Sequence, residues 1–260
     1  MIKKNIWDEV LNRGKWLIIF LVGLLFSQFP LALATFLTSR KFPLLQTGLL
    51  VGALSLVVLT VFIIGARKTQ LASFGLSFFK AKDLARLALS YLVILAFNIL
   101  GVVLLHLMNE TTTSNQSNIN DLVQNSSLIS SFFLLVLIAP ICEEILCRGV
   151  IPKKLFRGKE NVGYIVGAII FALLHLPTNL PSLLIYGGMS TVLTWTVYKT
   201  QRLEMSILLH MIVNGVFFCL LALVVIMSRT LGISVLHSMK IKEQTRKLAA
   251  GCSKHCEVAR

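Results

Sequence analysis

Long apolar runs separated by short polar segments follow one another along most of the chain. A transmembrane helix needs about 20 consecutive residues that are mostly apolar. Runs of suitable length lie at residues 16–37, 44–65, 87–108, 128–147, 162–176, 183–198 and 205–227. The pattern therefore predicts an all-α, polytopic transmembrane helix bundle of about seven spans, within a range of about six to eight.

Composition agrees with this prediction. Of the 260 residues, 56% are hydrophobic and 14% are charged, and the mean hydropathy is +0.81. A soluble domain of this size would expose too much apolar surface. The formal charge of +14 does not indicate a nucleic-acid partner, because the basic residues form no stripe interleaved with aromatic residues and no binding motif is present. We expect contact with membrane lipid and none with nucleic acid.

The basic residues predict an orientation. If the N-terminus is cytoplasmic, every lysine and arginine before Met227 falls on the cytoplasmic side except Arg40 and Lys41, in keeping with the positive-inside rule. The basic residues after Met227 would then lie outside, which is a conflict. Either the tail is translocated regardless, or one segment is re-entrant, or residues 231–239 hold a short return. We expect an integral, multi-pass protein of the plasma membrane with a cytoplasmic N-terminus.

The chain divides into four parts. Residues 1–15 form a cytoplasmic N-terminal segment, and residues 16–119 hold accessory transmembrane helices and an external loop. Residues 120–227 form the membrane core that carries the candidate chemistry, and residues 228–260 form a basic C-terminal tail.

The core begins with an unusual charged stretch, APICEEILCRGV at residues 139–150. Ionised groups in an apolar run are costly unless they are paired or functional. Residues four apart share one helix face, so Glu144 stacks over Arg148 and predicts an ion pair. Glu143 stacks over Cys147, where it has no cation, and is left available for acid–base chemistry.

Two prolines bear on how this helix continues. Pro140 is tolerated because the backbone groups that it frees can be satisfied inside a helix bundle. Gly149 and Pro152 predict that the helix stops soon after Cys147. The basic residues that follow predict a cytoplasmic turn with a short amphipathic helix at the membrane surface.

Two later segments each carry a polar pair at helical spacing. Phe171 and His175 are four residues apart, as are His210 and Asn214, so each pair lies on one helix face. A single histidine in an apolar helix is more often a packing residue. Polar residues in membrane spans tend to face the bundle interior and one another, so we expect these side chains to converge with Glu143.

Depth along the helices gives a first test of this convergence. At about 1.5 Å per residue, Glu143 lies about 22 Å from an outer start at residue 128, and His210 lies about 10 Å from an inner start near residue 203. Because the two distances are counted from opposite sides of a core about 30 Å thick, they place Glu143 and His210 at similar depths. His175, however, would lie about 20 Å from an inner start at residue 162, nearer the outer side. The mismatch requires a tilted helix, a turn that dips into the membrane, or different segment boundaries.

The motifs EExxxR, FxxxH and HxxxN, in this order on successive apolar segments, resemble the CAAX protease and bacteriocin-processing (CPBP, or Abi) family of intramembrane proteases. The type II CAAX prenyl endopeptidases share this domain. The resemblance covers about residues 120–225. One departure is Cys147, where an aromatic residue usually precedes the arginine, and we expect it to alter packing more than chemistry.

The resemblance implies a role for each matching residue. Glu143 would be the catalytic carboxylate, with His175 orienting or activating the attacking water. His210 and Asn214 would stabilise the oxyanion. Glu144, Arg148 and Phe171 would support the helices or position substrate.

The resemblance leaves the use of a metal open. In the alternative mechanism, Glu143, His175 and His210 hold a zinc ion with an open water position. The sequence lacks HExxH, which would have indicated a metal. The substrate would be a peptide or protein, anchored in the membrane in some members. For a bacterial chain, peptide maturation or bacteriocin self-immunity would fit better than processing of prenylated proteins.

Two other classes of function remain open. The same polar groups could line a proton or ion path in a transporter or channel, although we find no inverted repeat with broken helices. The protein could also be a non-catalytic immunity or scaffold protein that binds a peptide or partner through the bundle.

Overall fold

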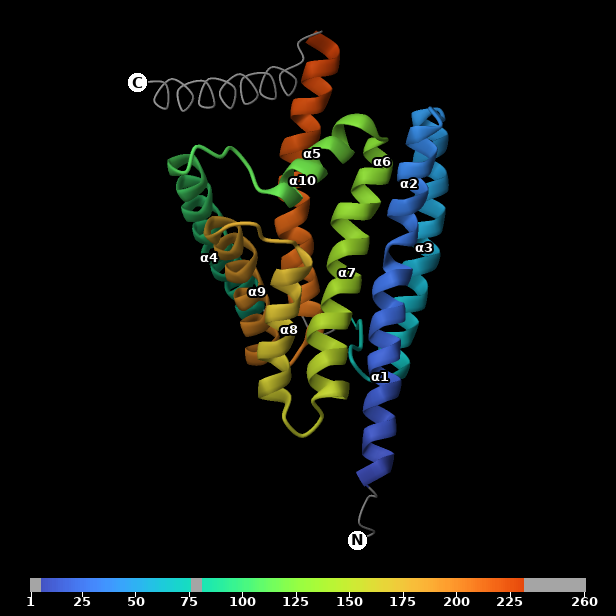
Figure 1. Ribbon diagram of the computed structural model, residues 1–260, viewed down its shortest axis with the longest axis vertical. Helices are drawn as coiled ribbons and strands as arrows, with labels where there is room; N and C mark the ends of the chain where they lie inside the picture. The colour runs from blue at the N-terminus through green and yellow to red at the C-terminus, as the bar shows by residue number, and fades with distance from the viewer. Residues whose placement is uncertain (1–5, 76–80, 232–260) are drawn as a thin grey trace, which may run out of the picture. The chain divides into compact units, whose positions relative to one another are not determined.

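The computed structural model describes residues 6–75 and 81–231, and these residues form helices and no strands (Figure 1). The all-α prediction is confirmed. Residues 1–5 of the predicted N-terminal segment and residues 232–260 of the predicted tail lie outside the described residues. The chain divides into two units, Met1–Phe218 and Cys219–Arg260. All the candidate site residues belong to the first unit.

The elements follow one another in chain order along the described residues: α1 (Ile6–Ser27), α2 (Phe29–Ser39), α3 (Leu44–Lys68), α4 (Ala81–Leu107), α5 (Ser114–Asn125), α6 (Leu128–Phe132), η1 (Phe133–Ile138), α7 (Ala139–Glu144), η2 (Ile145–Leu155), α8 (Glu160–Leu174), α9 (Leu180–Thr200) and α10 (Leu203–Leu231). The two η segments are π-helical, with wider turns than an α-helix.

Among the described residues, 6 helices are long and apolar enough to cross a membrane: Ile6–Ser39, Leu44–Lys68, Lys82–Leu107, Leu128–Leu155, Leu180–Thr200 and Leu203–Thr230. The protein is therefore a multi-pass membrane protein, with a span count at the lower end of the predicted range. The predicted fifth span is helix α8, which has only 15 residues. At a length of about 22 Å it is shorter than the hydrocarbon core of about 30 Å.

The polar segment between α4 and α6 contains helix α5. The hydroxyl of Thr113 caps this helix by accepting a hydrogen bond from the backbone N–H of Gln116 at 3.1 Å. Satisfying one of the free N–H groups at a helix start stabilises that end. A capped helix thus lies in the connection between α4 and the segment with the charged motif.

The segment with the charged motif is one helical run from Leu128 to Leu155, made of α6, η1, α7 and η2. The prediction that it stops soon after Cys147, before a surface helix, is wrong. The run continues through Pro152 because its wide π-helical turns accommodate a residue without an N–H. Counted from Leu155 and Glu160, the ends that face each other across the turn between η2 and α8, Glu143 and His175 agree in depth to within about one turn.

Each proline in this run frees a carbonyl five residues earlier, which is the π-helical partner of its missing N–H. Pro140 frees the carbonyl of Leu135, and Asn214 of α10 donates to it from Nδ2 at 2.9 Å. A neighbouring helix thus supplies the missing donor. The expected tolerance of Pro140 inside a bundle is confirmed.

Pro152 frees the carbonyl of Cys147 in the same way. Gly167 of α8 approaches this carbonyl so closely that a Cβ at position 167 would lie 2.2 Å from its oxygen. A Cα–H of the glycine therefore points at the oxygen, in a weak hydrogen-bond contact. Only glycine permits this approach, and the following turns of α8 bring Phe171 and His175 onto the same face.

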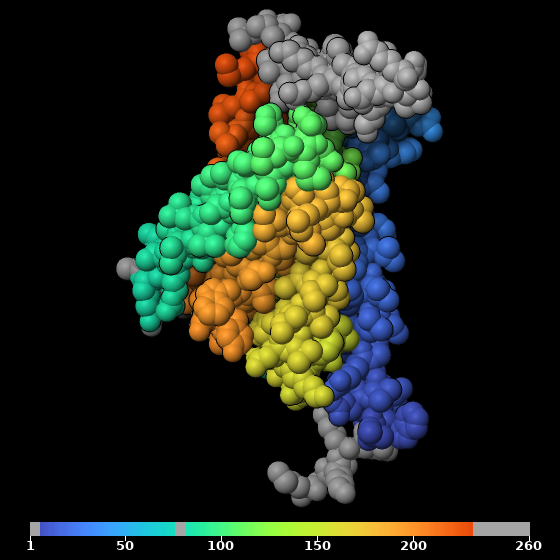
Figure 2. Space-filling view, turned by 60° about the vertical axis from the view of Figure 1, so that its left-hand side comes forward, coloured from blue at the N-terminus to red at the C-terminus, as the bar shows by residue number. Residues whose placement is uncertain are grey.

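Helices α8 and α9 pack against each other, α8 also packs on η2, and α9 packs on α4. Figure 2 shows this face of the first unit, with α4 beside α9 and α9 beside α8. Buried apolar side chains surround the region where these helices meet: Leu87, Ile94, Cys147, Phe171, Met189, Val192, Leu193, Met205 and Leu209. The candidate site lies in this apolar environment.

Candidate active site in the helix bundle

Glu144, the last residue of α7, has a side chain that is 0% exposed. Its Oε1 accepts hydrogen bonds from Arg148 Nη1 at 2.8 Å and from His210 Nδ1 at 3.0 Å. Its Oε2 accepts a hydrogen bond from the hydroxyl of Ser206. The predicted ion pair with Arg148 is present, and both oxygens of this carboxylate have partners.

Arg148 lies on η2 and contacts side chains of three other helices, α7, α8 and α9. Its Nη2 lies 2.6 Å from the hydroxyl oxygen of Ser190 and 3.2 Å from the carbonyl oxygen of Ser190, and its Nε lies 3.3 Å from the hydroxyl oxygen of Thr194. The guanidinium also lies over the ring of Phe171, at 4.0 Å from the centroid. A planar guanidinium can donate in several directions while it stacks on an aromatic face. These contacts compensate for burying the charge.

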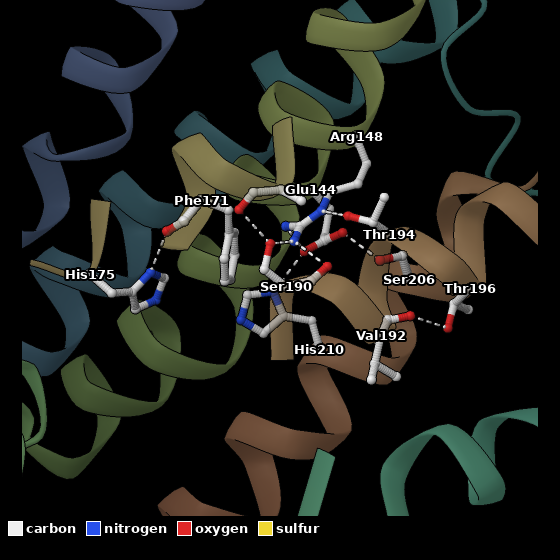
Figure 3. A network of polar contacts seen from close by, with 11 residues as sticks. Glu144, Arg148, Phe171, His175, Ser190, Val192, Thr194, Thr196, Ser206 and His210 are labelled. Atoms are coloured by element: carbon white, nitrogen blue, oxygen red, sulfur yellow. Dashed lines mark hydrogen bonds and ion pairs between the residues drawn. The ribbon is translucent and has the colours of Figure 1, made fainter. Parts of the chain in front are cut away.

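His210 is almost completely buried, and its role follows from its bond to Glu144 (Figure 3). An ionised carboxylate only accepts hydrogen bonds, so Nδ1 of His210 carries the proton in this contact. Nε2 remains for another partner. Ser206 lies one turn earlier on the same helix, so both bonds to Glu144 come from one face of α10.

His175 lies at the C-terminal end of α8. Its backbone N–H donates to the carbonyl of Ala172, three residues earlier, at 3.3 Å. The carbonyl of Phe171, four residues earlier, therefore lacks the N–H donor that a continuing α-helix would supply. The imidazole takes over, because Nδ1 of His175 lies 2.9 Å from that carbonyl oxygen. Since a carbonyl only accepts, Nδ1 carries the proton and Nε2 is the free nitrogen of the ring.

The ring of Phe171 contacts both imidazoles, with centroid distances of 4.6 Å to His175 and 5.6 Å to His210 (Figure 3). The structure thus joins His210 directly to Glu144 and brings His175 near them through an aromatic ring. Among the described residues, no group of three or more His, Cys, Asp and Glu side chains could hold a metal ion. Glu143, His175 and His210 are therefore not gathered into such a group in this structure.

Glu143 differs sharply from its neighbour Glu144. Its side chain is partly exposed, and its Oε2 is buried without a hydrogen-bond partner among the described residues. The division expected from the helical spacing, in which one carboxylate pairs with Arg148 and the other stays free of it, agrees with these contacts.

The three other polar residues of the motifs share a pattern. His175, His210 and Asn214 each use one group to satisfy a carbonyl or carboxylate of the fold, and each keeps a second group. These second groups are Nε2 of each imidazole, and the other N–H and the oxygen of the amide.

Sequence reasoning missed the contribution of α9. Tyr186, Ser190 and Thr194 follow one another at intervals of four residues, so they lie on one face of this apolar helix. Ser190 also donates to the carbonyl of Ala168 at 2.8 Å and ties α9 to α8. The signal was present as a polar stripe at helical spacing, but uncharged residues attract less attention than ionised ones.

Fold and side chains together define a multi-pass membrane protein with a buried cluster of carboxylate, guanidinium and imidazole groups. Residues 125–216 match the family described as "Type II CAAX prenyl endopeptidase Rce1-like". This range includes all three motifs. Residues 125–216 of the chain are therefore similar to this family of endopeptidases.

Comparison with individual proteins agrees. UPF0177 protein YvdC from Lactococcus lactis subsp. lactis is 28% identical over 216 residues, which are 82% of this chain and 79% of YvdC. The UPF0177 protein in the abiGi 5' region from Lactococcus lactis subsp. cremoris is 37% identical over 94 residues, 36% of this chain and 38% of that protein. The membrane-embedded CAAX protease MroQ from Staphylococcus aureus is 33% identical over 90 residues, 32% of this chain and 36% of MroQ. No solved structure matches.

Proposed function

We propose that this protein is an intramembrane endopeptidase that hydrolyses a peptide bond near the membrane surface, using a water activated by Glu143 and His175. The contrast between two adjacent carboxylates supports this most strongly. Glu144 accepts hydrogen bonds from three side chains, whereas Glu143 keeps a buried oxygen without a partner among the described residues. A carboxylate with a free oxygen can take a proton from water, as a general base must.

The proposed reaction assigns a group to each step. Glu143 takes a proton from the water while Nε2 of His175 accepts a hydrogen bond from it, and the water oxygen bonds to the peptide carbonyl carbon. The imidazole of His210 and the second N–H of Asn214, which donates a hydrogen bond, stabilise the resulting oxyanion. As the C–N bond breaks, the proton held by Glu143 passes to the leaving amine.

We propose a peptide or protein substrate that is itself anchored in the membrane, because the candidate residues lie within the apolar bundle. The similarity of residues 125–216 to a family of endopeptidases supports a peptide bond as the target. The name of MroQ describes a membrane-embedded CAAX protease. For this chain we propose a role in peptide maturation or in self-immunity to a bacteriocin.

A cytoplasmic N-terminus remains our proposal for the orientation. Lys154, near the end of η2, donates to the carbonyl of Thr69 at 2.7 Å, and its Nζ lies 5.2 Å from the ring centroid of Trp16. Three segments assigned to the cytoplasmic side by their basic residues thus meet in one place. This agreement supports the orientation.

Glutamine substitutions test the proposed function. Membranes from cells that produce the wild type, Glu143→Gln or Glu160→Gln would be compared for newly formed peptide ends by mass spectrometry. We expect Glu143→Gln to remove the ends that depend on the wild type and to leave folding intact. Glu160 is exposed at the start of α8, so Glu160→Gln should keep those ends. Wild-type peptide ends with Glu143→Gln would refute hydrolysis through this carboxylate.

A further inference from the structure

The imidazole of His175 contacts two aromatic rings. Phe171 contacts it with an interplanar angle of 38°, and Tyr186 of α9 stacks on it with a centroid distance of 4.7 Å and an angle of 23°. With Nδ1 bonded to the carbonyl of Phe171, both ring contacts and one nitrogen are fixed. Tyr186 therefore restricts rotation of this imidazole in a way that an aliphatic residue would not.

The hydroxyl of Tyr186 is fixed as well. It lies 2.7 Å from the hydroxyl of Thr113, and Asn115 donates to it from Nδ2 at 3.3 Å. Tyr186 and Thr113 are 8% and 4% exposed, so the pair is enclosed by protein. The phenol thus connects the imidazole to the start of α5, a segment distant from the three motifs in sequence.

A second contact holds the same segment. Glu110, in the loop before α5, accepts a hydrogen bond from Asn179 Nδ2 at 2.7 Å. Asn179 also caps α9, by accepting from the backbone N–H of Ser182 at 2.8 Å. In Figure 2 the segment that contains α5 lies against the start of α9. The segment before and at the start of α5 is therefore joined to α9 in two places, through Glu110 and through Thr113.

We propose that Tyr186 is a positioning residue for His175, and that Thr113 and Asn115 act on the imidazole through the hydroxyl of Tyr186. This inference rests on the proposed function, in which His175 orients the attacking water. Tyr186 itself touches neither the water nor the peptide. It keeps Nε2 of His175 directed to one place, together with the contact from Phe171 and the hydrogen bond at Nδ1.

The first test compares Tyr186→Leu, which removes the aromatic ring, with Tyr186→Phe, which removes only the hydroxyl. Tyr198→Leu is the matched control, because Tyr198 lies on the same helix and is 40% exposed. With a peptide that the wild type cleaves, we expect Tyr186→Leu to lower kcat by about tenfold or more, with KM changed by less than about twofold. Tyr186→Phe should recover most of the lost kcat, and Tyr198→Leu should equal the wild type.

A second measurement does not depend on catalysis. Diethyl pyrocarbonate modifies accessible imidazoles, and mass spectrometry identifies the modified residue. We expect Tyr186→Leu to change the modification rate of His175 by about threefold or more, since a ring released from stacking samples other orientations. If Tyr186→Leu does not fold, Thr113→Val provides the same comparison through the hydroxyl alone, with a smaller expected change.

The outcomes separate this inference from the proposed function. Wild-type kcat and modification rate in the Tyr186 and Thr113 variants, with Glu143→Gln inactive, would overturn the inference and leave the proposed function standing. An altered His175 modification rate in the Tyr186 variants, together with full activity in Glu143→Gln, would refute the proposed function. The conclusion that Tyr186 fixes the orientation of the His175 imidazole would still stand. A fall in kcat without any change at His175 would also overturn the positioning role.

Discussion

The close approach of α8 to η2 at Gly167 makes a specific prediction for Gly167→Ala. The new Cβ would lie 2.2 Å from the carbonyl oxygen of Cys147 and 3.2 Å from its carbonyl carbon. A carbon–oxygen contact needs about 3.3 Å, so the two helices must separate by about 1 Å. Backbone atoms cause the clash, and no side-chain rotation can relieve it.

The expected cost has two parts. Overpacking of this kind destabilises by about 1–3 kcal/mol. Because Phe171 and His175 follow Gly167 at intervals of four residues, the shift of α8 also moves the imidazole. A displacement of about 1 Å can lower activity by about a hundredfold. We therefore expect a loss of activity larger than the loss of stability alone would produce.

Gly187→Ala on α9 is the matched control. The same change in helix propensity applies, about 1 kcal/mol in favour of alanine, but nothing lies within 4 Å of a Cβ at position 187. Unfolding in mixed micelles with increasing dodecyl sulfate gives the stability difference, and cleavage of one peptide gives the activity. If Gly167→Ala matched Gly187→Ala in both measurements, the close approach of α8 would have no role in placing His175.

Two further substitutions test the energetics of the site. Arg148→Met should lower the free energy of unfolding by about 3–5 kcal/mol, because it leaves the carboxylate of Glu144 buried without its cation. Adding Glu144→Gln should recover part of this loss in a double-mutant cycle. Additive costs of the two substitutions would contradict the coupling. Leu176→Gly should stabilise by about 0.5–1 kcal/mol without loss of activity, because Leu176 has φ 48 and is 73% exposed; a lower unfolding midpoint in the same micelle assay would show that this backbone conformation is not strained.

Much of the site could be predicted because it follows helical periodicity. The spacing of Glu144 and Arg148 predicted their ion pair, and the spacing of Phe171 and His175 predicted a shared face. The end of the charged helix could not be predicted, because Pro152 is normally a signal for termination. Inside this bundle a π-helical turn and the close approach of Gly167 accommodate it, and both depend on tertiary packing.

The role of each polar group was also beyond sequence reasoning. The amide of Asn214 was expected to serve the reaction, yet one of its N–H groups completes the backbone bonding of η1 at Leu135. Helix α8 was expected to span the membrane because its residues are apolar, but its length is fixed by the turn of the chain at His175. Periodicity identifies which residues share a face, whereas partners on other helices decide what each one does.

The two freed carbonyls of the Leu128–Leu155 run affect how the protein can be recombined with relatives. Pro140 needs an amide from α10, and Pro152 needs a residue without a side chain on α8. A chimaera that exchanges only this run would place its prolines opposite foreign neighbours and leave polar oxygens unpaired in an apolar environment. Segment exchange should therefore succeed only when the Leu128–Leu155 run, α8 and α10 are transferred together.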